Sequence, residues 1–182
     1  MQGSRFIIFN ALTFQLVWWS SVLYGNQALA LLCLLLMLHF GLSPSPMKDA
    51  GLMIRFSLIG WLVDGLLAFA GVFSFTAFPF WLLLLWLHFS ITLHHSLSFC
   101  RRLPGWVQAV LGGVAGCLSY LGGARFGAVA LPLGHIASAA ILMIIWSVLL
   151  PLGCRLADST AEKHRAARES RENPEETSDD TH

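Results

Sequence analysis

Charged residues are scarce in this sequence, and their scarcity excludes a soluble globular domain. Asp, Glu, Lys and Arg make up 12% of the 182 residues, whereas 56% are hydrophobic, and the mean hydropathy is +0.68. Soluble domains carry about 25% charged residues. The composition therefore predicts an all-α, polytopic membrane protein whose main partner is the lipid bilayer. No nucleic-acid partner is expected.

Motifs for metal binding and nucleophilic catalysis are also missing. The four cysteines are dispersed without a C-x-x-C pair, so they indicate neither a disulfide framework nor a zinc ribbon. His88 and His95 lie too far apart along one helix to share an ion, although the sequence leaves open a site assembled from several helices. No G-x-S-x-G frame surrounds any serine. We therefore expect no metal and no cofactor.

Long apolar stretches fill the chain up to Arg155. A transmembrane helix needs about 20 consecutive apolar residues, and six stretches approach or exceed that length. The sequence therefore predicts a bundle of six transmembrane helices over residues 1–155, followed by a polar, partly disordered tail over residues 156–182. Ser159 and Glu162 have capping-box spacing, which predicts a short surface helix in the tail. The predicted spans are about residues 6–24, 27–43, 51–74, 78–99, 105–123 and 134–154.

Basic residues are distributed asymmetrically between the predicted loops and ends. Ten of the eleven Lys and Arg residues fall on the side of the two termini, and only Arg125 falls on the other side. Loops rich in Lys and Arg remain in the cytoplasm, so we expect both termini to be cytoplasmic. On the opposite side, residues 122–134 are too broken by Gly and Pro for an ordinary turn. They form either a short helix on the outer surface or a broken span of the kind that lines transporter sites.

One acidic residue, Asp64, lies inside a predicted span. Eight of the ten acidic residues follow Cys154, and Asp49 is assigned to a Pro-rich loop. An ionisable side chain within a bilayer is costly and usually faces the bundle interior, a partner or a water-filled cavity. Asp64 is therefore the first candidate for proton handling or solute contact. The structural alternative is a hydrogen bond or ion pair with a histidine or with Tyr120.

Other polar residues of the predicted spans fall into two layers when their depth is counted at about 1.5 Å per residue. Asn10, His39 and His95 lie about one turn into the membrane, whereas Gln15 and His88 lie near its middle, at the level of the buried carboxylate. Such side chains either line a cavity or hydrogen-bond between helices, which is common in membrane bundles.

The fourth predicted span carries several of these polar side chains on one face. At about 100° per residue, His88, Thr92 and His95 project within one sector, whereas His94 points away. The fifth span carries Gly112 and Gly116 at the spacing that lets a helix of the same chain or of a second copy approach closely, so the oligomeric state stays open. The candidate intramembrane polar site contains Asp64, His88, Gln15, Tyr120, Thr92, His95 and Asn10.

Several short motifs together resemble a known family. They include Phe14-Gln15, Asp64-Gly65, Pro79-Phe-Trp81, His95-Ser96 and Tyr120-Leu-Gly-Gly123. Over about residues 6–152 the chain resembles the bacterial inner-membrane family called domain of unknown function 2878. The resemblance implies a helical bundle in the inner (cytoplasmic) membrane and an association with membrane lipids or lipid-modifying proteins. It supplies no activity.

Three functions of different classes are compatible with these observations. The first is an accessory or scaffolding protein of the inner membrane that serves lipid modification or the envelope. The second is a small carrier or lipid-handling protein with a polar cavity centred on Asp64. The third is an intramembrane enzyme that uses Asp64 and a histidine as acid and base. Because no catalytic frame is present, we rank the enzyme last.

Overall fold

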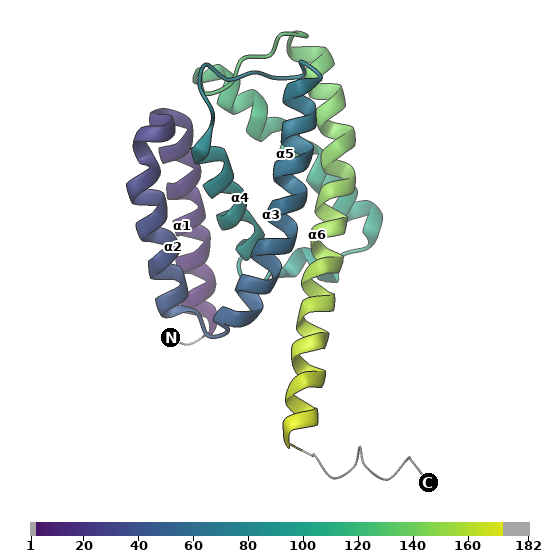
Figure 1. Cartoon of the computed structure of the whole chain (residues 1–182). Coiled ribbons are helices and arrows are strands. Elements are labelled where there is room, and N and C mark those ends of the chain that lie inside the picture. The colour runs from purple at the N-terminus through teal and green to yellow at the C-terminus, as the bar shows by residue number, and fades with distance from the viewer. Residues whose placement is uncertain (1–2, 173–182) are drawn as a thin grey trace.

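The computed structural model of the protein describes residues 3–172, with the backbone alone described at residues 161 and 163–172. Its regular elements are helices, and successive α-helices run in alternate directions (Figure 1). The prediction of an all-α fold is confirmed. In chain order the elements are α1 (Gly3–Tyr24), the 3₁₀-helix η1 (Gly25–Ala28), α2 (Leu29–Leu42), α3 (Pro46–Phe69), α4 (Phe80–Thr92), the 3₁₀-helix η2 (Ser98–Arg102), α5 (Gly105–Arg125) and α6 (His135–Glu172).

Most of these helices are long and apolar enough to cross a membrane. Four segments of the described chain meet that condition: Ser4–Leu42, which comprises α1, η1 and α2, together with Pro46–Phe69, Gly105–Arg125 and His135–Thr160. α4 is apolar but has only 13 residues, a length of about 20 Å against a hydrocarbon core of about 30 Å. The number of spans and their orientation therefore stay predictions.

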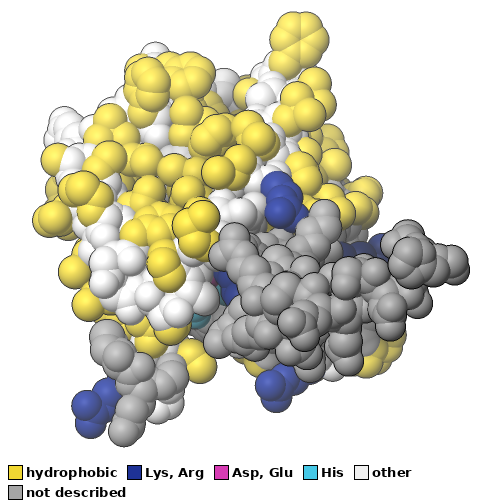
Figure 2. Space-filling view, turned by 60° about the horizontal axis from the view of Figure 1, so that its bottom comes forward, with side chains coloured by type: hydrophobic (Ala, Val, Ile, Leu, Met, Phe, Trp, Pro, Cys, Tyr) yellow, Lys and Arg dark blue, Asp and Glu magenta, His cyan; other side chains and the backbone are white. Residues whose placement is uncertain are grey.

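The outer surface of the bundle is apolar. Leu12, Leu62, Leu118 and Ile144 lie on four different helices, and each exposes at least 60% of its surface. Figure 2 shows apolar side chains covering the upper part of the visible face, whereas Lys and Arg side chains lie from about its middle downward. An apolar exterior of this extent indicates contact with lipid, because soluble monomers rarely expose such patches.

Aromatic rings that lie on glycines form the centre of the bundle. Trp86 of α4 covers Gly60 of α3 so closely that a Cβ atom there would overlap the indole. The same indole stacks on Trp146 of α6, with ring centroids 5.3 Å apart and planes inclined by 8°. Trp146 in turn covers Gly116 of α5. A continuous stack therefore connects α3, α4, α6 and α5, and the two glycines provide the room for the rings.

The glycine pair predicted to mediate helix packing lies between α5 and α6 of the same chain. A Cβ atom at Gly112 would overlap the carbonyl oxygen of Trp146, and one at Gly116 would overlap the ring of that residue. α6 therefore occupies the face of α5 that carries both glycines. Of the two arrangements that the sequence left open, this is the intramolecular one.

Several helix ends differ from the predicted boundaries, and the C-terminal ends of α4 and α6 differ most. α4 ends at Thr92 instead of continuing to residue 99, because the backbone N–H groups of His95 and Leu97 both turn back to the Thr92 carbonyl. α6 continues to Glu172 without a break after residue 154. Ser159 does not cap a separate tail helix, since its hydroxyl donates to the Leu156 carbonyl within α6. The sequence there is rich in Ala, Arg and Glu, which are strong helix formers. The predicted disorder at the chain end concerns residues 173–182, outside the described residues.

Residues 122–134 form neither a surface helix nor a broken span. α5 continues to Arg125, and the chain then turns through Gly127 and Gly134, whose φ angles of 79° and 82° favour glycine. Between these turns, Ala130 exchanges two backbone hydrogen bonds of 2.9 Å with Ser74 in the loop between α3 and α4. Pairing with the other loop satisfies the polar backbone of this apolar segment, which removes the need for a helix.

Candidate functional site

Asp64 is buried, and both of its carboxylate oxygens accept hydrogen bonds from aromatic side chains. Tyr120 Oη of α5 donates to Oδ1 over 2.6 Å, and Trp86 Nε1 of α4 donates to Oδ2 over 2.6 Å. The carboxylate therefore joins α3, α4 and α5. Of the partners considered from the sequence, Tyr120 is the one found and no histidine takes part; the contribution of Trp86 was missed.

A cavity of about 640 Å³ lies beside this cluster, between α1, α4 and α5. Trp86 and Tyr120 form part of its wall, and Gln15 of α1 also lines it. Asp64 and His88 are not among the lining residues. The carrier hypothesis placed a polar cavity around Asp64, whereas the rings of Trp86 and Tyr120 separate the carboxylate from the cavity found. The wall is mainly aromatic and aliphatic.

The mouth of the cavity lies between α1 and α5. Trp19 and Leu118 both line the cavity and expose 45% and 60% of their surfaces, respectively. A hydrogen bond of 2.8 Å from Trp18 Nε1 to Ser119 Oγ joins the same two helices. The cavity is therefore accessible from the side of the bundle, along the apolar surface.

The remaining members of the predicted polar site are dispersed. His88 Nε2 donates to the Leu32 carbonyl of α2 over 3.0 Å, on a face of α4 that does not line the cavity. Asn10 Oδ1 accepts hydrogen bonds from the backbone N–H and the hydroxyl of Ser96. Thr92 Oγ1 donates to the Phe89 carbonyl in its own helix. These three side chains form hydrogen bonds between or within helices and do not line the cavity. This is the structural role that polar residues commonly have in membrane bundles.

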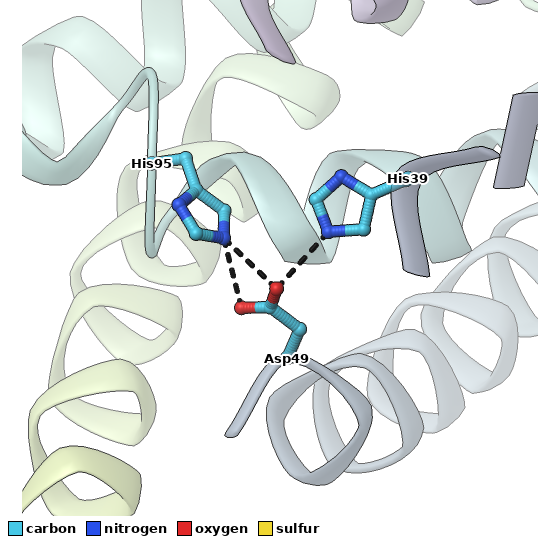
Figure 3. Close-up of side chains that lie close together, drawn as sticks. All are labelled: His39, Asp49 and His95. Carbon is cyan, nitrogen blue, oxygen red and sulfur yellow. Dashed lines mark hydrogen bonds and ion pairs between the residues drawn. The ribbon is translucent and has the colours of Figure 1, made fainter. Parts of the chain in front are cut away.

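A second cluster surrounds Asp49, which was predicted to lie in a loop. Asp49 lies in the first turn of α3 and is fully buried. His39 Nε2 from the end of α2 lies 3.0 Å from Asp49 Oδ2. His95 Nε2, from the turn after α4, lies 2.9 Å from each of the two carboxylate oxygens. Figure 3 shows both imidazoles directed at the carboxylate from different elements.

Further contacts complete the surroundings of this carboxylate. His94 Nδ1 lies 3.1 Å from Asp49 Oδ1, so the prediction that His94 points away from the polar residues is wrong. The chain leaves helical geometry after Thr92, which brings both His94 and His95 to Asp49. Ser43 Oγ donates to Asp49 Oδ2 over 2.6 Å. The carboxylate is therefore surrounded by three imidazoles and a hydroxyl.

One sequence signal identifies the position of Asp49. Pro46 follows Ser45, and proline is favoured at the first position of a helix because its missing N–H has no partner there. α3 begins at Pro46, which places Asp49 in the first turn instead of in a loop. His39 and His95 were correctly placed at one depth, but the carboxylate between them was left out.

The described chain is a bundle of apolar helices with a lipid-compatible exterior, a buried carboxylate cluster at its centre and a lateral apolar cavity. These are the features of a helical membrane protein. The family described as "Protein of unknown function (DUF2878)" matches residues 7–152, and the chain belongs to this family. A search of curated proteins and a search of solved structures each gave no match.

Proposed function

We propose that this protein is a lipid-handling accessory protein of the bacterial inner membrane, which binds one acyl chain of a membrane lipid in the cavity between α1, α4 and α5. The observation that carries this proposal is the lateral mouth between α1 and α5, flanked by exposed apolar side chains. A ligand that enters there comes from the hydrocarbon region. The volume of about 640 Å³ lies within the range of about 300–1,000 Å³ that is usual for ligand sites.

The wall chemistry supports an acyl chain over a polar solute. Apolar rings such as Phe14, Trp81 and Phe89 line the cavity, and the few polar groups include Gln15 and Ser119. The Ser119 hydroxyl is already engaged by Trp18. A sugar or an ion would leave its own polar groups without partners against such a wall, which costs free energy.

Ala115→Trp is expected to reduce acyl-chain binding about tenfold, a change that corresponds to about 1.4 kcal/mol. Ala115 lines the cavity and is exposed there, so an indole at this position fills space without entering the packed core. The measurement is photo-crosslinking in nanodiscs with a phospholipid that carries a diazirine in its acyl chain. Adducts of the wild type are expected on the lining residues of α1 and α5.

Val114→Trp is the matched control, because Val114 is 45% exposed on the same helix and does not line the cavity. The yield and the positions of the crosslinked adducts of this variant should equal those of the wild type. Equal labelling of the two tryptophan variants, or adducts spread evenly over the lipid-facing surface, contradicts the proposal.

The proposal includes six membrane crossings with both termini in the cytoplasm. The basic residues Arg5, Lys48, Arg101 and Arg155 support this topology, because in a chain of alternating helices they belong to one end of the bundle. Fluorescent-protein fusions after residues 44 and 103 and at the C-terminus should fluoresce. Alkaline phosphatase fusions after residues 26, 76 and 130 should be active. Phosphatase activity of a C-terminal fusion contradicts this topology.

A further inference from the structure

We propose that His39, Asp49 and His95 form a binding site for a divalent transition-metal ion, which joins α2, α3 and the turn after α4. The proposal is independent of acyl-chain binding, since none of the three residues lines the cavity. One potential ligand atom from each residue lies within 4.8 Å of the other two. His39 and Asp49 are 10 residues apart in the sequence, and His95 follows 46 residues after Asp49.

The distances between the donor atoms are close to those of a metal site. The nitrogens of His39 and His95 lie 3.0 Å and 2.9 Å from Asp49 Oδ2. With ligands about 2.0–2.1 Å from a tetrahedral zinc ion, neighbouring ligand atoms lie roughly 3.3 Å apart. Small rotations of the imidazoles therefore suffice to place an ion between the three side chains.

Four polar side chains converge on the Asp49 carboxylate. Asp49 Oδ2 lies within 3.0 Å of Ser43 Oγ, His39 Nε2 and His95 Nε2. His95 Nε2 lies equally close, at 2.9 Å, to Oδ1, which His94 Nδ1 approaches to 3.1 Å. If hydrogen bonding alone holds the cluster, all three imidazoles must therefore present an N–H to this one carboxylate. A cation bound by the two imidazole lone pairs and the carboxylate replaces these competing donors with a single positive charge. Buried carboxylates are commonly compensated in this way.

Surrounding residues hold the carboxylate as the outer shell of a metal site does. Ser43 donates to Asp49 Oδ2 and itself accepts the backbone N–H of Ser45. His94 Nδ1 lies against Asp49 Oδ1, and its other ring nitrogen lies 3.4 Å from the Ala157 carbonyl of α6. Hydrogen bonds of this kind orient ligands and tune metal affinity.

The site is enclosed, and its donors match a definite class of ion. His39, Asp49 and His95 expose 2%, 0% and 8% of their surfaces. The ring of Phe6 packs against both imidazoles, at centroid distances of 5.4 Å and 4.8 Å. Two imidazoles and one carboxylate suit Zn²⁺ and the neighbouring first-row ions better than Mg²⁺ or Ca²⁺, which prefer oxygen ligands.

Metal binding by the purified full-length chain tests the proposal. The protein is produced with a tag that lacks histidine, treated with a chelator in detergent and titrated with Co²⁺ and then Zn²⁺. About one Co²⁺ per chain should give a visible absorption band that Zn²⁺ displaces, and Zn²⁺ should raise the melting temperature because it binds the folded state. A wild-type chain that binds neither ion at this stoichiometry overturns the proposal.

Variants assign the ligands. His39→Ala, His95→Ala and Asp49→Asn should each weaken Zn²⁺ binding more than about 100-fold, because losing an outer-shell partner alone costs about 10- to 100-fold. Ser43→Ala should fall within that smaller range. His135→Ala is the control, since His135 is exposed and lies at the start of α6; it should bind as the wild type does. Stoichiometric binding that survives all three ligand substitutions also overturns the proposal, whatever their effect on folding.

Discussion

Substitution of Asp64 by leucine is expected to lower the free energy of unfolding by about 2–6 kcal/mol, because a buried donor without an acceptor costs about 1–3 kcal/mol and two donors lose theirs. These donors are Trp86 Nε1 and Tyr120 Oη, which belong to residues that are 3% and 9% exposed. Leucine has the same branched arrangement of side-chain heavy atoms as aspartate, so the substitution removes the hydrogen-bond acceptors without opening a cavity. Unfolding in mixed detergent micelles measures it.

Asp158→Leu is the control for this prediction. The Asp158 side chain is 52% exposed and pairs with Arg101 over 2.9 Å, and exposed pairs contribute about 0–1 kcal/mol. A double-mutant cycle with Tyr120→Phe separates the partners, since the cost of Asp64→Leu should fall by about 1–3 kcal/mol once the phenol hydroxyl is absent. Equal losses for the two aspartate variants contradict the proposed role of Asp64 in holding three helices.

Substitution of Gly112 by alanine is expected to destabilise the bundle by about 1–3 kcal/mol, the usual cost of overpacking. The new Cβ would overlap the carbonyl oxygen of Trp146, which is a backbone atom and cannot rotate away. α5 and α6 must therefore separate. Thermal unfolding in detergent and the same micelle titration measure the effect.

Gly122→Ala on the same helix is the matched control. A Cβ atom at Gly122 would lie 3.5 Å from the nearest atom of Trp18, an ordinary contact. Alanine is also a better helix former than glycine by about 1 kcal/mol, so this variant should be neutral or slightly stabilised. If both alanine variants unfold alike, close packing at Gly112 is not what holds α5 against α6.

The sequence predicted the height of buried polar groups better than their direction. Counting residues from the helix ends placed Tyr120 within reach of Asp64, and the two side chains form a hydrogen bond. The same count placed His88 beside them, but its imidazole faces α2. Rise per residue fixes depth, whereas the direction of a side chain in a bundle depends on how the helices are rotated against one another. No pattern within a single helix contains that rotation.

Helix boundaries were the second source of error, and they account for the overlooked cluster. Asp49 was assigned to a loop because the span was started at residue 51, whereas α3 begins at Pro46. His94 was predicted to point away from His95 because α4 was predicted to continue past Thr92, where the helix ends. Both errors fall at the same end of the bundle, where His94, His95 and Asp49 meet. A site at a helix end can be predicted only when the helix boundary is placed to within one or two residues. Boundaries are the least certain part of a sequence-based assignment.

α6 belongs both to the packed interior of the bundle and to the part of the protein that extends beyond it. Its 38 residues span about 57 Å, far more than the hydrocarbon core of about 30 Å, and its last turns project beyond the other helices (Figure 1). The same rod carries Trp146 in the central stack and the Ala157 carbonyl beside His94. A force on the projecting turns therefore acts on the same helix that carries the central aromatic stack.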